Sequence, residues 1–217
     1  MSDHAIIHGR AAVLPIANLD TDQIMPKQFL RGIDKSGLAQ GLLYDLRFDG
    51  AGQPRPEFVL NQPAQAGANV LIAGPNYGCG SSREHAVWGM QQFGFQAVIA
   101  SSFGEIFYSN AMNNRLMLAV LGEPEVQALM REAEASDGAL AVEIDVAQRC
   151  VRSPRLTASF TLSERHRRMF LDGLDVIGAS LSYREQIRQF AQQHWAAQPW
   201  VQDVARITRK RLDAAAS

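Results

Sequence analysis

The chain has 217 residues, 47% of them hydrophobic, and its acidic and basic residues nearly balance at a formal net charge of −1. A chain of this size can bury a sizeable core without a membrane or disulfide bonds. The balanced charge does not favour nucleic acid or an anionic membrane surface as a partner, so we expect a small-molecule substrate. No leader-like segment or apolar run of about 20 residues occurs, so we expect a cytoplasmic protein.

The chain shows few breaks in its composition. It contains no internal repeat or low-complexity tract, and the polar segment 49–56, with Gly and Pro, indicates an exposed turn. We therefore predict a single domain at residues 1–200.

A strand, a loop, a helix and a second strand are predicted in the middle of the chain. Residues 69–73 form an apolar run that favours a strand, and the glycines within residues 74–80 indicate a tight loop. From Ser81 the apolar residues recur with helical spacing until residues 97–100 begin another strand. Such a unit places its strands parallel and its loop at the carboxyl edge of the sheet, where open α/β folds bind ligands.

Alternating helices and strands continue toward the carboxyl terminus, which predicts an α/β fold with a mixed sheet. Helices are predicted at residues 104–113, 124–135 and 183–195, and strands at residues 116–121, 140–146 and 158–162. We expect the last two strands to be antiparallel or mixed.

A helical tail is predicted at residues 201–217. It carries a group of basic residues, namely Arg206, Arg209, Lys210 and Arg211. We interpret them as a solvated helix face, with a partner-binding face as the alternative.

The segment 78–85 carries the most distinctive side chains, and it lies where the predicted strand meets the start of the predicted helix. Free backbone amides and the positive end of the helix dipole favour an anion there. Arg83 adds a guanidinium suited to a carboxylate, and the hydroxyls of Ser81 and Ser82 lie beside it in sequence. The glycine spacing differs from that of a P-loop or a dinucleotide-binding fingerprint. We therefore predict a site for a carboxylic acid.

Ser81 has two interpretations that do not exclude each other. With Glu84 it matches a capping box, in which its side chain would close the helix amino terminus. It could also supply a catalytic hydroxyl. A serine acts as a base only as an alkoxide, which nearby donors such as backbone amides and Arg83 would have to stabilise.

The two cysteines, Cys79 and Cys150, lie far apart in the sequence. They do not indicate a disulfide framework, and they are too few to ligate an ordinary iron-sulfur cluster. We interpret Cys79 as a small loop residue, because no second cysteine or histidine stands at ligand spacing, and His85 as a polar contact. No metal site is predicted.

Several segments together resemble the swivelling domain of aconitases and the small subunits of isopropylmalate dehydratases. The similarity runs in one order through residues 18–30, 76–86, 106–110, 113–114 and 172–178. It covers about residues 5 to 195. The resemblance implies a three-layer β/β/α swivelling domain, with a mixed sheet that contains the parallel strand-loop-helix-strand unit.

The same resemblance implies roles for the residues of the loop. Ser81 would be the catalytic base that removes the substrate proton, while Ser82 and Arg83 would bind a substrate carboxylate and stabilise the alkoxide. Asp22 would join the active site from the first loop. The alternative for Asp20 and Asp22 is a local turn before Pro26.

The resemblance also implies a loop over the variable part of the substrate, formed by Phe29, Leu30 and Arg31. Phe29 and Leu30 suit a branched alkyl group. Arg31 would face solvent in that case, whereas an Arg31 that faces the substrate would favour a third carboxylate, as in homocitrate.

The family reaction removes water from a 2-hydroxy acid and returns it at the neighbouring carbon. It uses a four-iron four-sulfur cluster whose open iron acts as a Lewis acid. The resemblance therefore implies that this chain holds no cofactor, and that a large subunit supplies the cluster and acts with it on a small hydroxy diacid.

Two positions depart from the family pattern, since Val87 and Leu118 stand where bacterial small subunits commonly have Pro. The expected activity is interconversion of 2- and 3-isopropylmalate in leucine biosynthesis. A sister subunit acting on citramalate, dimethylmalate or homocitrate is the first alternative, and a non-catalytic carboxylate-binding module is the second.

Overall fold

The computed structural model describes residues 5–30, 36–136 and 138–215. The chain divides into two compact units, Met1–Asp175 and Val176–Ser217. The predicted boundary between residues 200 and 201 lies inside the second unit. Helix α8 (Arg184–Ala197), which the sequence placed in the domain, has no buried residue, so its apolar spacing does not mark a buried face.

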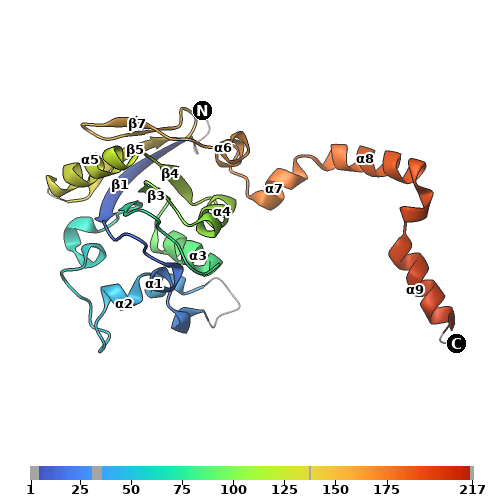
Figure 1. The fold of residues 1–217 in the computed structure, drawn as a ribbon, viewed down its shortest axis with the longest axis horizontal. Coiled ribbons are helices and arrows are strands. Elements are labelled where there is room, and N and C mark those ends of the chain that lie inside the picture. Colours follow the sequence, from blue (N-terminus) through green and yellow to red (C-terminus); the bar gives the residue numbers. More distant parts are fainter. Residues whose placement is uncertain (1–4, 31–35, 137, 216–217) are drawn as a thin grey trace. The chain divides into compact units, whose positions relative to one another are not determined.

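One mixed sheet forms the centre of the first unit. Its strands are β1 (Ile6–Leu14), β2 (Val70–Ala73), β3 (Ala97–Ala100), β4 (Met117–Val120), β5 (Leu140–Asp145), β6 (Cys150–Arg152) and β7 (Thr157–Ser159). Their order is β4-β3-β2-β1-β5-β6-β7, parallel from β1 to β4 and antiparallel from β1 through β5 and β6 to β7. Figure 1 shows this sheet curled, with helices packed around it. The predicted α/β class and mixed sheet are confirmed.

The long strand β1 was not predicted, although it joins the parallel and antiparallel halves of the sheet. It pairs with β2 on one side and with β5 on the other. His8, Gly9 and Arg10 interrupt its apolar pattern and hide it from sequence reasoning. Gly9 is required by packing, because a Cβ there would lie 2.4 Å from Cγ2 of Val70.

Helices cover both faces of the parallel strands. They are α3 (Glu84–Phe93), α4 (Glu105–Asn113) and α5 (Glu123–Glu134), close to the predicted ranges. Strands β2 and β3 are buried at every residue, as expected when both faces are covered. Helix α5 contacts β1, β2 and β3, and Figure 1 shows it across the sheet from α3 and α4.

Further helices complete the two units. The first unit also contains α1 (Thr21–Ile24), α2 (Tyr44–Arg47) and α6 (Glu164–Leu171), and the second contains α7 (Val176–Leu181), α8 and α9 (Val204–Ala215). The sequence did not predict α6, whose residues are mostly polar. The hydrophobic core lies entirely in the first unit and ends at Phe170.

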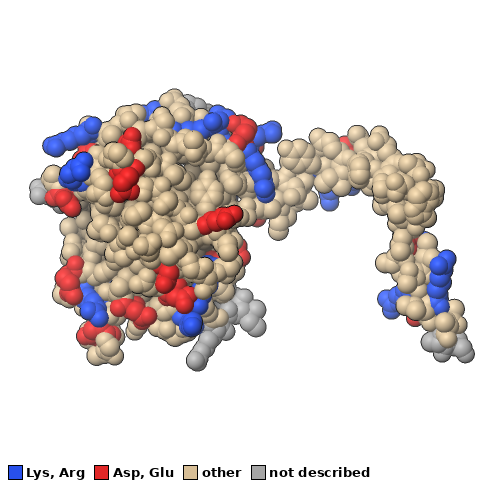
Figure 2. Space-filling model, viewed as in Figure 1, with Lys and Arg blue, Asp and Glu red and all other residues tan. Residues whose placement is uncertain are grey.

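The surface carries charges of both signs. On the face of the first unit shown in Figure 2, acidic and basic side chains are interspersed. Within the described ranges, no helix is both long and apolar enough to cross a membrane.

Candidate active site

The loop after β2 is shaped by two glycines. Gly78 and Gly80 have φ angles of +74° and +87°, which other residues rarely adopt. A Cβ on Gly78 would lie 2.3 Å from the ring of Phe107, so the backbone of the loop rests directly on helix α4. A Cβ on Gly104 would lie 2.4 Å from the carbonyl oxygen of Gly78. The predicted tight loop at the carboxyl edge of the sheet is therefore packed against α4.

A second loop, from early in the chain, lies alongside the first. The amide of Gly78 donates to the carbonyl of Leu19 (2.8 Å), and the amide of Thr21 donates to the carbonyl of Cys79 (2.9 Å). The buried hydroxyl of Thr21 donates to the carbonyl of Ser81 (2.8 Å). These bonds join segments about sixty positions apart. We call residues 18–22 and 76–83 together the two-loop site.

Three predicted site residues meet at one carboxylate. Oδ1 of Asp22 accepts a hydrogen bond from Nη2 of Arg83 (2.8 Å) and a longer one from Oγ of Ser81 (3.4 Å). The side chain of Arg83 is 15% exposed and that of Asp22 is 42% exposed. Ser82 is exposed next to them. The structure thus brings together Asp22, Ser81 and Arg83 at a partly open edge of the molecule.

The predicted capping box of Ser81 and Glu84 is wrong. Helix α3 begins at Glu84 with Arg83 as its N-cap, and no side chain caps it. Ser81 lies too early in the chain for that role, and its hydroxyl turns toward Asp22 instead. Glu84 accepts a hydrogen bond from Nδ2 of Asn114 (2.6 Å). The first amides of α3 are consequently not occupied by the hydroxyl of Ser81.

Asp20 has a local structural role, as the cap of a helix instead of the turn before Pro26 that was the alternative interpretation. Its Oδ1 accepts from the amide of Gln23 (2.7 Å), and Oε1 of Gln23 accepts from the amide of Asp20 (3.1 Å). This capping box begins helix α1 and positions Asp22 in its first turn. The two aspartates therefore differ, since Asp20 shapes the loop and Asp22 faces Arg83.

Sequence reasoning assigned no role to two residues that hold the site in place. Thr21 joins the loops, as described above. Asn114 donates from Nδ2 to Glu84 and accepts at Oδ1 from Nε1 of Trp88 (3.1 Å), which fixes the start of α3 against the end of α4. The paired asparagines at 113–114 were the one signal that pointed to this position.

The remaining predicted residues lie farther along the first loop. Phe29 packs against Tyr44 with ring centroids 5.0 Å apart, and both Phe29 and Leu30 are partly buried against the core. Arg31 lies outside the described residues. Phe29 therefore has a packing role whether or not it also contacts a substrate.

Neither cysteine is placed as a metal ligand. Sγ of Cys79 donates to the carbonyl of Asn18 (3.3 Å), while Cys150 is buried on β6. The ring of His85 lies 4.9 Å from that of Trp88. In the described part of the chain, no group of three His, Cys, Asp or Glu residues could hold a metal ion. The two thiols do not fit the ligand set of a four-iron cluster.

The two departures from the family pattern are core positions. Val87 lies inside α3 and Leu118 inside β4, and both side chains are fully buried. Neither side chain is exposed to a substrate in this chain.

Comparison with known proteins gives a consistent result. Residues 1–122 match the family described as Aconitase C-terminal domain. The 3-isopropylmalate dehydratase small subunit 1 of Chromobacterium violaceum is 63% identical, and the match covers 98% of this chain and 100% of the relative. The 3-isopropylmalate dehydratase small subunit of Phenylobacterium zucineum is 46% identical over 90% of this chain and 96% of the relative. A crystal structure of 3-isopropylmalate dehydratase from Methanocaldococcus jannaschii covers 86% of this chain and 99% of that chain, with a TM-score of 0.61 and 29% identity.

Proposed function

This chain belongs to the aconitase C-terminal domain family and, within it, to the small subunits of 3-isopropylmalate dehydratase, and we propose that it performs their part of the reaction. It forms half of a cytoplasmic hydro-lyase that interconverts 2- and 3-isopropylmalate in leucine biosynthesis. The observation that carries this proposal is the convergence of Asp22, Ser81 and Arg83 at one carboxylate. The matches to the two named relatives, which cover 98% and 90% of this chain, support it.

Ser81 is proposed as the base that removes the substrate proton. Its hydroxyl caps no helix and points to Asp22, so it is available for chemistry. A serine alkoxide requires strong stabilisation, which the guanidinium of Arg83 and the free amides at the start of α3 can provide. Asp22 orients the hydroxyl of Ser81 and the side chain of Arg83 at the same time.

Arg83 and Ser82 are proposed to bind a substrate carboxylate. Arg83 uses two of its donors on Asp22 and on the carbonyl of Met25 (3.4 Å). A guanidinium has five N–H groups, so donors remain for a carboxylate. Ser82 is exposed beside it and adds a hydroxyl.

The cluster is proposed to belong to a large subunit. Cys79 and Cys150 lie on separate elements and do not fit its ligand set, as described above. A four-iron four-sulfur cluster supplies a Lewis acid for the departing hydroxyl when it is bound to the partner. The residues of this chain contribute the base and the carboxylate contacts.

Specificity for a branched alkyl group is proposed to come from Phe29 and Leu30. Both are apolar and only partly buried on the first loop. If Arg31 faces solvent, Arg31→Ala leaves isopropylmalate turnover nearly unchanged. A preference of the native enzyme for homocitrate would instead place Arg31 at a third carboxylate.

The test uses the full chain alone and copurified with its large subunit. We expect the isolated chain to be colourless and inactive, and the complex to turn over isopropylmalate with a higher kcat/KM than citramalate, dimethylmalate or homocitrate. A preference for one of the other acids would replace the substrate assignment and leave the lyase assignment in place. Turnover and an iron-sulfur absorption band from the isolated chain would contradict the division between the subunits.

A further inference from the structure

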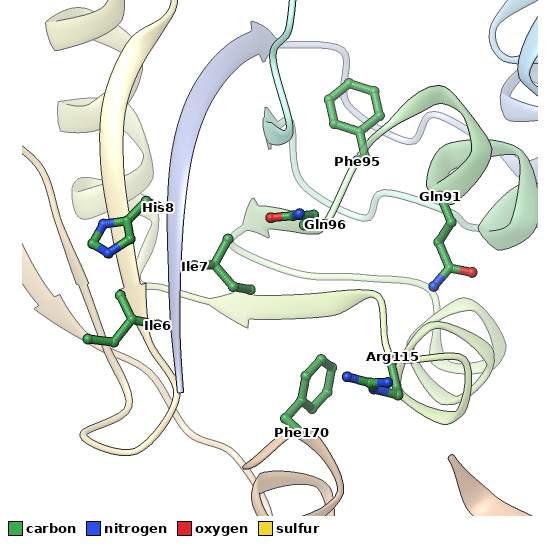
Figure 3. A pocket seen from close by; sticks show the side chains of 8 residues that line it. All are labelled: Ile6, Ile7, His8, Gln91, Phe95, Gln96, Arg115 and Phe170. Carbon is green, nitrogen blue, oxygen red and sulfur yellow. The ribbon is translucent and has the colours of Figure 1, made fainter. Parts of the chain in front are cut away.

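A cavity of about 420 Å³ lies in the first unit, away from the two-loop site. Its walls include Ile7, Gln91, Phe95, Gln96, Arg115 and Phe170. Figure 3 shows Ile7 on the side of β1 that faces Phe170 and Arg115, with Gln91 reaching toward Arg115 from α3. The volume is within the range of small-molecule sites, roughly 300–1,000 Å³.

The cavity lies at the opposite edge of the parallel strands from the two-loop site. Gln96 directly precedes β3, Arg115 comes just before β4, and Ile7 is near the start of β1. The amino ends of parallel strands share one edge of a sheet. The Ser81 loop follows the carboxyl end of β2, at the other edge. A ligand in this cavity would therefore not touch Ser81, Arg83 or Asp22.

Arg115 brings a positive charge to the cavity without a partner for it. Its Nε is buried and has no hydrogen-bond partner. None of the ion pairs in the described ranges includes Arg115. A buried donor that stays unpaired is costly, and a guanidinium is suited to binding a carboxylate. The charge of Arg115 therefore favours an anionic ligand.

Two glutamines place further polar atoms in the wall. Oε1 of Gln96 accepts from Nδ2 of Asn69 (3.2 Å), which leaves its amide N–H groups for another acceptor. Nε2 of Gln91 donates to the carbonyl of Asn114 (2.6 Å), which leaves its carbonyl oxygen. Gln96 can thus assist Arg115 in binding an anion, while Gln91 limits how much negative charge the cavity tolerates.

Apart from His8, whose exposed ring lies 3.7 Å from Glu143, the rest of the wall is apolar and favours a ligand with an alkyl group. Phe95 and Phe170 are buried aromatic residues, and Ile7 packs against the same core. No acidic residue is among the lining residues, so an ammonium group would lack a charged partner. Inorganic phosphate would leave the apolar wall unused.

We propose that this cavity binds a small organic monocarboxylate with a short alkyl chain. The carboxylate accepts hydrogen bonds from Arg115 and Gln96, and the alkyl chain packs against Ile7, Phe95 and Phe170. This proposal does not depend on the proposed function, because it concerns the other edge of the sheet.

The test is a titration of the purified full chain with isocaproate, in which ligand-observed NMR and calorimetry measure the binding. Isocaproamide has the same alkyl chain without the charge. We expect its affinity to be lower than that of isocaproate by about tenfold or more. Arg115→Gln should weaken isocaproate binding by about tenfold to a hundredfold, the range for a hydrogen bond to a charged group. Arg131→Gln, on the exposed surface of α5, is the matched control and should change nothing.

A second variant tests the proposal in case Arg115→Gln does not fold. Gln96→Glu keeps the acceptor for Asn69 and adds a negative charge that competes for Arg115, so it should also weaken the binding of isocaproate. Equal binding of isocaproate and isocaproamide, or of isocaproate and inorganic phosphate, would overturn the proposal. The absence of isocaproate binding to the native chain would also overturn it. That result holds even if Arg115→Gln impairs assembly with the large subunit, because Arg115 would then have a structural role only.

Discussion

The two-loop site and the second unit, Val176–Ser217, are held in different ways. In the two-loop site, hydrogen bonds join residues about sixty positions apart, and the backbone of Gly78 rests on the ring of Phe107. In the second unit, the side-chain contacts described join residues three or four positions apart, such as Arg206 with Asp203. None of its described residues is buried.

The two regions therefore owe their structure to different interactions, local ones in the second unit and long-range ones in the two-loop site. The helices of the second unit follow from local sequence, whereas the geometry around Asp22 requires the whole first unit to fold. Catalysis depends on side-chain positions within fractions of an ångström, and the long-range contacts of the first unit can fix positions that closely. We therefore expect substitutions in the two-loop site to affect catalysis or stability strongly, and matched substitutions elsewhere to have small effects.

The largest effect is expected for Ser81→Ala in the assembled enzyme. Removal of the proposed base should lower kcat by about 10²–10⁴-fold. Stability should change little, because Ser81 caps no helix. Steady-state kinetics and thermal unfolding of the same preparation measure both quantities.

Ser163→Ala is the matched control for this change. Ser163 caps α6 by accepting from the amide of His166 (3.2 Å). Its removal should cost about 1 kcal/mol of stability and leave kcat unchanged. A nearly normal kcat in Ser81→Ala would remove Ser81 from the mechanism.

The second prediction compares the same substitution on α4, directly beneath the two-loop site, and in the second unit. Phe107→Ala should destabilise the isolated chain by about 3–5 kcal/mol, because it removes a buried ring beneath Gly78 and Tyr77. Phe190→Ala should cost less than about 0.5 kcal/mol, because that side chain on α8 is 67% exposed. Chemical denaturation of the two variants measures the difference. Similar losses would mean that the second unit has tertiary packing of its own.

The third prediction concerns the guanidinium of Arg83. Arg83→Lys should lower kcat/KM of the assembled enzyme by about tenfold to a hundredfold, because a lysine cannot contact Asp22 and a substrate carboxylate with one planar group. Arg149→Lys is the control, since Arg149 makes an exposed pair with Glu164 (2.9 Å) and exposed pairs contribute little. Equal kinetics for both variants would exclude Arg83 from substrate binding.

Local sequence was enough to predict the loop after β2. The apolar run before it, its glycines and the helical spacing after Ser81 are all short-range signals, and they predicted a site at the carboxyl edge. The same signals failed at the start of α3. The pattern of Ser81 and Glu84 matches a capping box, but a distant residue, Asp22, attracts the hydroxyl instead.

The parts that could not be predicted depend on contacts between distant segments. Strand β1 has a polar, glycine-containing centre, and only its pairing with β2 and β5 makes it a central strand. Thr21 and Asn114 have ordinary sequence surroundings, and their roles appear only when the loops meet. Asp22 and Arg83 were brought into one site by family resemblance, since no local pattern connects them.

The smallest effect is expected for His166, near the end of the first unit. Burial, together with the charge of Arg165, lowers the pKa of His166 below its usual value of 6.5. Its Nδ1 is buried without a hydrogen-bond partner, so protonation would add an unpaired donor. The unfolded chain therefore binds more protons than the folded chain at mildly acidic pH, and stability should fall as the pH decreases below about 6.5. His166→Gln removes this titration, so the difference in Tm between about pH 7.5 and pH 5.5 should be smaller in the variant than in the native chain. An identical pH dependence of Tm in both chains would show that His166 titrates alike in the folded and unfolded states.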